Sequence, residues 1–168
     1  FTYENHSLYE KAMNLTYGNK LPPFKYYLTI LATFKNEGKI LEEWLEHHIA
    51  HGVEHFYLVN DHSTDNCMSL LAPYLENGIV TMFNAPSVAS QFRQVALYRN
   101  SIVRIMATNE SQWVAIIDLD EFLYSPKEVD IKNVLRQHED LALVGLNWVW
   151  FGANSYAKQP GSVIQSFT

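Results

Sequence analysis

Cysteine is nearly absent from this sequence, because Cys67 is the only one in 168 residues. A single cysteine cannot form an intrachain disulfide, and it cannot supply the thiolates of a cysteine-based zinc site. We therefore expect Cys67 to be a buried packing residue. With 48% apolar and 18% charged residues, a chain of this length can bury a sizeable core, and its composition excludes intrinsic disorder.

Positive charge and long apolar runs are also scarce. The 12 Lys and Arg residues are outnumbered by 18 Asp and Glu, which gives a formal net charge of −6. No basic stripe is present to neutralise phosphates, so nucleic-acid binding is not expected. No apolar run reaches the roughly 18 residues of a membrane helix, so no membrane span is predicted. Neither G-x-G-x-x-G nor a Walker loop occurs, which excludes those two phosphate-binding motifs.

Runs of β-branched and aromatic residues predict strands at 26–34, 55–59, 79–83 and 113–117. A further strand is expected to start within 141–146, and 163–168 also resembles a strand. Between these runs, apolar residues recur at helical spacing. The predicted helices carry Leu41, Trp44, Leu45, His48 and Ile49 (ended by Gly52); Leu70, Leu71 and Tyr74; Phe92, Val95, Ala96, Ile102, Val103 and Met106 (capped by Ser87 or Ser90); and Ile131, Val134 and Leu135.

Strands that alternate with helices predict an α/β fold, with a mainly parallel sheet flanked by helices on both faces. Residues 1–25 are mixed and polar, and we expect an irregular lead-in there, followed by one domain over 26–168. Because the chain begins with Phe1 and closes on a predicted strand, we expect it to be a piece of a longer polypeptide.

Asp118 and Asp120 follow directly on the predicted strand 113–117. If the extended backbone continues, their two carboxylates point to the same side. A hard divalent cation relieves the repulsion between them, and Mg²⁺ or Mn²⁺ takes oxygen ligands from one or two carboxylates plus substrate phosphates. The pattern favours a metal site, with a solvated turn as the alternative.

A second polar run, 60–65, follows the predicted strand 55–59. Asp61 in this run can accept a hydrogen bond from a ribose hydroxyl or a base N–H, while the next residues cap a helix. Ligands of parallel sheets bind beyond the carboxyl ends of the strands, where both polar runs are expected. His47 and His51 lie one helical turn apart, but we interpret neighbouring His48 as a buried, hydrogen-bonded imidazole and expect no metal there.

Four stretches together resemble the nucleotide-sugar-binding half of a GT-A glycosyltransferase, in particular glycosyltransferase family 92 and the related family-2-like enzymes. The four stretches lie within residues 28–168. The first is Lys35-Asn36-Glu37 with Glu43-Trp44 and His47-His48; the second is Gly52-Val53 leading to residues 60–65; the third is residues 113–123; and the fourth is Trp150-Phe151-Gly152. Tyr98-Arg99-Asn100 also resembles the Arg-Asn of family-2 helices.

The resemblance implies the Rossmann-like GT-A fold and a metal-dependent, inverting transfer of sugar from a nucleoside-diphosphate sugar to a glycan or other hydroxyl acceptor. It implies Mn²⁺ or Mg²⁺ on Asp118 and Asp120. The implied nucleotide-sugar contacts are Asn36, Glu37, Asp61, Arg93, Gln94, Arg99 and Asp118. UDP is the favoured nucleotide, because a carboxylate at Asp61 suits the imide N–H of uracil.

The catalytic base is not assigned. The base of such enzymes lies well downstream of the Asp-x-Asp, and Glu121, next to the metal pair, does not suit that role. Two other functions stay open: a non-catalytic nucleotide-sugar or carbohydrate-binding module, and a phosphohydrolase with an aspartyl nucleophile. The single cysteine slightly favours the cytoplasm, whereas three Asn-x-Ser/Thr sequons favour a secretory lumen.

Overall fold

The structure is a computed structural model that describes residues 24–87, 92–152, 155–158 and 160–166. Residues 1–23 of the predicted lead-in and the candidate cap Ser90 lie outside these ranges. Four parallel strands form one sheet in the order β3-β2-β1-β4. They are β1 (Tyr26–Phe34), β2 (His55–Asn60), β3 (Val80–Asn84) and β4 (Ser111–Ile116). The four strands predicted between residues 26 and 117 are therefore confirmed, β1 with the predicted ends and the other three with ends shifted by at most two residues.

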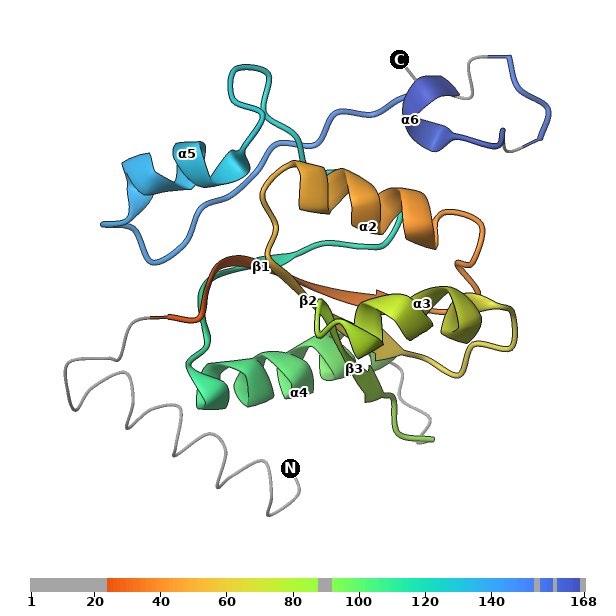
Figure 1. The fold of residues 1–168 in the computed structure, drawn as a ribbon, viewed down its shortest axis with the longest axis horizontal. Coiled ribbons are helices and arrows are strands. Elements are labelled where there is room, and N and C mark those ends of the chain that lie inside the picture. Colours follow the sequence, from red (N-terminus) through yellow and green to blue (C-terminus); the bar gives the residue numbers. More distant parts are fainter. Residues whose placement is uncertain (1–23, 88–91, 153–154, 159, 167–168) are drawn as a thin grey trace.

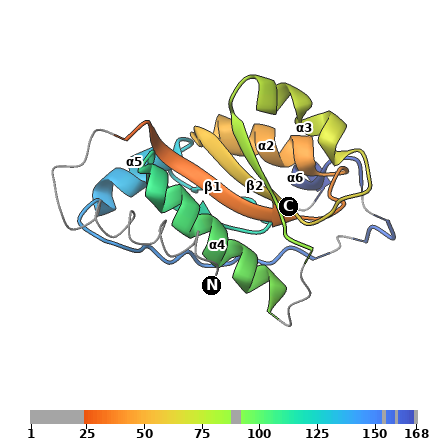
Figure 2. The same cartoon turned by 90° about the horizontal axis from the view of Figure 1, so that it is seen from below.

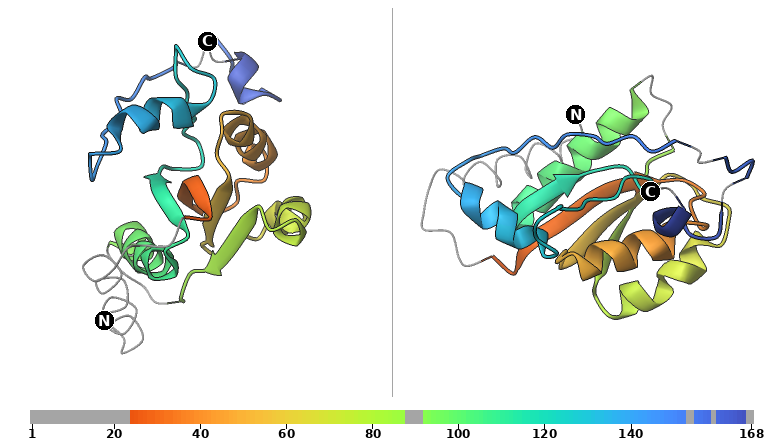
Figure 3. Two further views of the ribbon diagram at one scale, coloured as in Figure 1. Left: turned by 60° about the vertical axis from the view of Figure 1, so that its left-hand side comes forward. Right: turned by 90° about the horizontal axis from the view of Figure 1, so that it is seen from above.

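Helices cover both faces of this sheet (Figures 1 and 3). Helices α2 (Leu41–Ala50) and α3 (Cys67–Glu76) lie on one face, and α4 (Arg93–Thr108) crosses the other, as Figure 2 shows from below. The chain continues on the α2 side with α5 (Ile131–Leu135), the 3-10 helix η1 (Arg136–His138) and α6 (Val163–Ser166). The predicted α/β class is confirmed. No helix in the described part of the chain is both long and apolar enough to cross a membrane.

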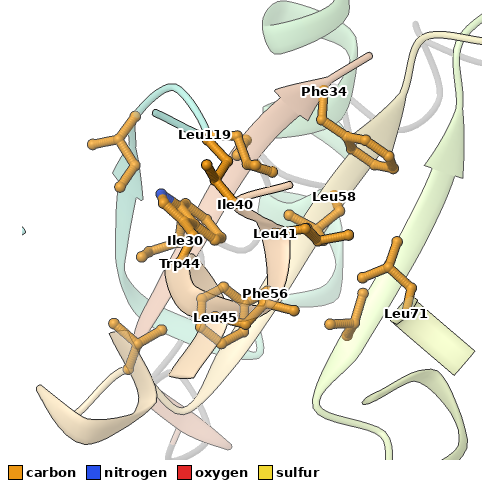
Figure 4. Close-up of a cluster of buried hydrophobic side chains, with 14 of the residues drawn as sticks. Ile30, Phe34, Ile40, Leu41, Trp44, Leu45, Phe56, Leu58, Leu71 and Leu119 are labelled. Carbon is orange, nitrogen blue, oxygen red and sulfur yellow. The ribbon is translucent and has the colours of Figure 1, made fainter. Parts of the chain in front are cut away.

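The larger core lies between the sheet and helices α2 and α3 (Figure 4). Alternate residues of β1 point into it, and they meet Leu41, Trp44 and Leu45 of α2, all fully buried. Cys67 at the start of α3 is fully buried in the same core, and burial raises the pKa of its thiol to about 12. The prediction that Cys67 is a buried packing residue is therefore confirmed.

Helix α2 ends where the sequence predicted. Gly52 has a φ of +94°, and a Cβ built there would lie 2.1 Å from the carboxylate oxygen Oδ1 of Asp130. Only glycine meets both conditions, because other residues rarely adopt positive φ. The chain therefore turns sharply into β2, which begins at His55.

Helix α4 differs from the prediction in the face that it buries. Phe92, Val95 and Met106 are exposed, and the buried stripe runs through Leu97, Ser101 and Ile105 at intervals of four residues. Because the polar Ser101 lies in the middle of this stripe, the spacing of apolar residues in the sequence does not reveal it. The helix begins at Arg93, and Phe92 at its N-cap position makes no side-chain cap. The predicted cap Ser87 lies in a bend six residues earlier.

Two predicted strands are wrong. Residues 141–146 form no strand, and Leu143 is 84% exposed, because no described strand pairs with this run. Residues 163–166 form the short helix α6, while 167–168 lie outside the described residues. The Glu43 carboxylate accepts hydrogen bonds from the N–H groups of Val163 and Ile164, at 2.8 and 3.2 Å. This pairing satisfies first-turn amides and favours a helical turn.

Candidate active site

A pocket of about 360 Å³ opens beyond the carboxyl ends of β1 and β4. The chain runs from β1 to β2 and β3 on one side of the sheet and then returns to place β4 on the other side of β1. Ligands of open parallel sheets bind at such a switch of direction. The pocket is lined by Thr33, Phe34, Lys35, Glu37, Asp61, Arg93, Gln94, Leu97, Asp118, Leu119 and Asp120.

Residues 118–121 form a turn, which we call the acidic turn. The Glu121 N–H donates to the Asp118 carbonyl at 3.1 Å, and the Asp118 N–H donates to the Glu121 carboxylate at 2.9 Å. Strand β4 has ended at Ile116, so the extended backbone expected through Asp120 is not present. Leu119 is buried between the two aspartates, with 3% exposure. Both aspartates still line the pocket, because a turn anchored by Leu119 brings them there.

The carboxylate of Asp118 is held by two side chains of α4. Its Oδ1 accepts hydrogen bonds from Gln94 Nε2 at 2.9 Å and from the Tyr98 hydroxyl at 2.8 Å. Burial, together with the nearby Asp118 carboxylate, raises the pKa of Tyr98 to about 12, so the phenol keeps its proton and donates. Gln94, which is expected to contact the nucleotide sugar, lines the pocket and contacts Asp118 there.

Asp61 follows β2 and pairs with Arg93 at the first turn of α4. The backbone N–H of Asp61 donates to the Phe34 carbonyl at 2.8 Å, which fixes this residue at the end of β1. Arg93 Nε lies 2.9 and 3.0 Å from the two carboxylate oxygens. These hydrogen bonds hold the pKa of Asp61 below its usual range. The pair lies 32 residues apart in sequence, and no local pattern predicts it.

Two expected site residues do not line the pocket. Asn36, with a φ of 60°, bridges two loops: its N–H donates to Ser63 Oγ at 3.0 Å, and its Oδ1 accepts from the Thr64 N–H at 2.7 Å. It therefore holds the loops after β1 and β2 together. Arg99 is exposed on α4, outside the pocket lining.

Negative charge prevails in the pocket, where Glu37, Asp61, Asp118 and Asp120 face only two basic residues, Lys35 and Arg93. Burial raises the pKa of Glu37, and the nearby Asp120 and Asp65 raise it further. In the described part of the chain, no group of three His, Cys, Asp or Glu side chains is arranged to ligate a metal. Asp118 and Asp120 together offer two carboxylates, which fits a hard cation that completes its ligand shell with phosphate oxygens and water.

The sequence reasoning missed part of this pocket. Tyr98 is one helical turn after Gln94 on α4, and this spacing alone would have placed both side chains on one face of a helix. Lys35 stands within the Lys35-Asn36-Glu37 stretch, and its position directly after β1 was the available signal. Leu97 and Thr33 carry no signal, because their role comes from the packing of α4 on β1.

The parallel sheet and the polar pocket beyond β1 and β4 define an α/β protein with a pocket at a topological switch point, where sheets of this kind bind ligands. Residues 31–166 match the glycosyltransferase family 92 pattern. The chain therefore belongs to glycosyltransferase family 92, and the resemblance drawn from the four stretches is confirmed.

Curated relatives agree with this assignment. A glycosyltransferase family 92 protein of Oryza sativa subsp. japonica is 26% identical over 119 residues, which cover 70% of this chain and 20% of the rice protein. A glycosyltransferase family 92 protein of Ricinus communis is 23% identical over 113 residues, which cover 67% of this chain and 20% of the Ricinus protein. The chain thus spans about a fifth of the length of these relatives. Among solved structures, S. aureus TarS 1–349 in complex with UDP has a TM-score of 0.48 and 15% identity, covering 82% of this chain and 41% of that one.

Proposed function

We propose that this chain binds the donor in a metal-dependent glycosyltransferase that moves a sugar from a nucleoside-diphosphate sugar to an acceptor hydroxyl, with inversion. The observation that carries the proposal is the meeting of Asp118 and Asp120 in one pocket at the switch point of the sheet, in a chain of this family. Asp118 and Asp120 would hold Mn²⁺ or Mg²⁺. When bound, such a cation neutralises the charge that grows on the departing diphosphate.

The residues of the chain supply orientation and charge. Gln94 and Tyr98 donate to one oxygen of Asp118, which leaves its second oxygen available for a ligand. Arg93 and Lys35 are the cationic groups of the pocket, and their charge suits phosphate oxygens. Glu121 is not proposed as the base that deprotonates the acceptor, because its carboxylate already accepts the Asp118 N–H. The proposal assigns that base to no residue of this chain.

Uridine is the nucleoside that we propose, on the basis of Asp61. An ionised carboxylate has about four acceptor sites, and Arg93 occupies three of them through Nε and Nη2, which leaves room for one more donor. The imide N–H of uracil is such a donor, whereas adenine and cytosine present an unprotonated ring nitrogen at the matching edge. A carboxylate facing that lone pair gains no hydrogen bond from the base and is repelled by it, which disfavours adenine and cytosine.

Calorimetric titration of the 168-residue chain with UDP, in Mn²⁺ and in EDTA, tests the proposal. We expect Asp120→Ala to lose the Mn²⁺-dependent part of the affinity, because one of two carboxylate ligands is gone. Its stability should change by no more than about 0.5 kcal/mol, since Asp120 is exposed. Unchanged affinity in the variant would remove the metal assignment.

Competition among UDP, GDP, ADP and CDP in Mn²⁺ decides the base. Tightest binding of UDP supports the role of Asp61, and tightest binding of GDP keeps that role but corrects the base. Tightest binding of ADP or CDP would contradict it. Hydrolysis or transfer of the sugar of a UDP-sugar by this chain would exclude a non-catalytic module.

A further inference from the structure

The position of Asp120 depends on its backbone alone. Asp120 is exposed, and among the described residues no donor reaches its carboxylate, in contrast to Asp118 with its two donors from α4. Strand β4 no longer supports this segment after Ile116. On one side Asp120 adjoins Leu119, whose side chain is anchored in the larger core. On the other side it adjoins residues 121–123, which form no regular secondary structure.

Three side chains from one face of α2 hold residues 121–123, and we call them the α2 clamp. Trp44 Nε1–H donates to the Glu121 carbonyl at 2.7 Å. His48 Nε2 accepts the Leu123 N–H at 3.0 Å, and His47 Nε2 donates to the Leu123 carbonyl at 2.8 Å. Both polar groups of Leu123 are thus bound by neighbouring histidines. The ring of Phe122 lies against the same two imidazoles, with centroids 5.2 Å from His47 and 6.0 Å from His48.

The geometry fixes the tautomer of His48. Its Nδ1 lies 2.7 Å from the Trp44 carbonyl, which can only accept, so Nδ1 carries the proton. Nε2 is then the acceptor that the Leu123 N–H requires. If Nε2 also carried a proton, its N–H would point at the N–H of Leu123, and two donors would face each other. His48 is fully buried, which keeps the imidazole neutral.

We propose that Trp44, His47 and His48 are positioning residues, which set the acidic turn so that Asp120 meets the metal of the donor complex. The inference rests on the proposed function, since it concerns the same cation. Its physical basis is that Asp120 sits between two fixed points, the buried Leu119 and the clamped segment 121–123. Loss of one clamp bond to that segment should spread the positions of the Asp120 carboxylate while the buried core of α2 keeps the fold. Partners that orient metal ligands in this way typically contribute about 10–100-fold in metal affinity or activity.

His47 offers the cleanest test, because it is half-buried and its loss removes one clamp bond from a helix that keeps its fully buried residues. His47→Leu removes the donor to Leu123, and His47→Gln restores an N–H near the same place. His51→Leu is the matched control: His51 stacks on His47 at 4.1 Å and bonds the His47 carbonyl, but none of its hydrogen bonds reaches residues 121–123. UDP with Mn²⁺ or EDTA is the probe, and amide exchange at Leu123 reports the clamp in metal-free protein.

We expect His47→Leu to lower the Mn²⁺-dependent affinity for UDP about tenfold and to speed exchange at Leu123, with a thermal midpoint close to that of His51→Leu. His47→Gln should recover both properties. If Mn²⁺ raises the UDP affinity of His47→Leu as much as that of His51→Leu, the positioning role alone is overturned. Failure of His47→Gln to recover the Mn²⁺ effect would also overturn that role alone. Equal binding of UDP by the wild-type chain in Mn²⁺ and in EDTA would overturn the proposed function, and this inference with it.

Discussion

The face of the sheet that α2 and α3 cover buries sixteen residues in one cluster among those described, whereas the α4 face buries six. Apolar area removed from water contributes about 25 cal/mol per Å², so the α2 face supplies more of the folding free energy. The thinner α4 face instead presents polar side chains, since Arg93, Gln94 and Tyr98 all reach the pocket aspartates. The α2 face contributes more to stability, and the α4 face supplies the side chains that contact the pocket aspartates directly.

The largest expected effect tests that difference in stability. Trp44→Ala should lower the free energy of unfolding by about 3–5 kcal/mol, because a fully buried ring and its bond to Glu121 are both lost. Leu97→Ala on the α4 face should cost about 2–3 kcal/mol, since fewer buried neighbours surround it. Urea unfolding of both variants gives the comparison. A loss for Trp44→Ala no larger than that for Leu97→Ala would contradict the larger contribution of the α2 face.

Acid should weaken the packing of α2, which carries the fully buried His48. Burial lowers the pKa of His48 to about 3, against 6.5 as its ordinary value, so the unfolded chain binds more protons between these limits. Stability is then fully present above about pH 6.5 and falls as the pH drops toward 3, by up to about 1.4 kcal/mol per unit for one group. The buried polar residue of α4 is Ser101, which does not titrate in this range.

Urea midpoints at pH 7, 6 and 5 measure this dependence in the wild-type chain and in His48→Gln. The variant should show a shallower slope, with the remainder due to His47 and His55, whose pKa values burial also lowers. Parallel slopes in the two proteins would show that His48 does not carry the effect.

The smallest effect concerns the α4 side of the site. Tyr98→Phe removes the 2.8 Å hydrogen bond to Asp118, while Gln94 keeps its own. We expect a loss of about 0.5–1.5 kcal/mol in unfolding free energy, and a change of similar size in Mn²⁺-dependent binding of UDP. Scanning and titration calorimetry on Tyr98→Phe and on the wild-type chain measure the unfolding free energy and the UDP affinity. A loss as large as that of Trp44→Ala would place α4 among the elements that support the fold.

The sequence predicted the elements best where a single local pattern decides them. The apolar run of β1 and the spacing of Leu41, Trp44 and Leu45 each point to one structure, and both are confirmed. The run 141–146 failed because a strand also needs a partner, which no local pattern contains. The buried face of α4 failed because Ser101 interrupts its apolar stripe.

The sequence predicted where in the fold the site lies, but not how its side chains are arranged. Asp61, Asp118 and Asp120 were expected at strand ends, and the topology of a parallel sheet brings such ends together. The ion pair of Asp61 with Arg93 joins residues 32 apart in sequence. The hydrogen bond from Trp44 to the Glu121 carbonyl joins residues 77 apart. Those contacts depend on how the helices pack, which the sequence alone does not specify.

The strand order also sets a sequence of events in time. Strand β1 pairs with β2 across one short crossover, but Tyr26 meets its β4 partner Ser111 only 85 residues later, and the acidic turn follows β4. Closing a longer loop costs more entropy, and pairings between distant segments form slowly. A refolding chain should thus acquire most of its helix before its pocket is complete. Nucleotide binding that lags behind the recovery of far-ultraviolet circular dichroism is the measurable sign of that order, and simultaneous recovery would contradict it.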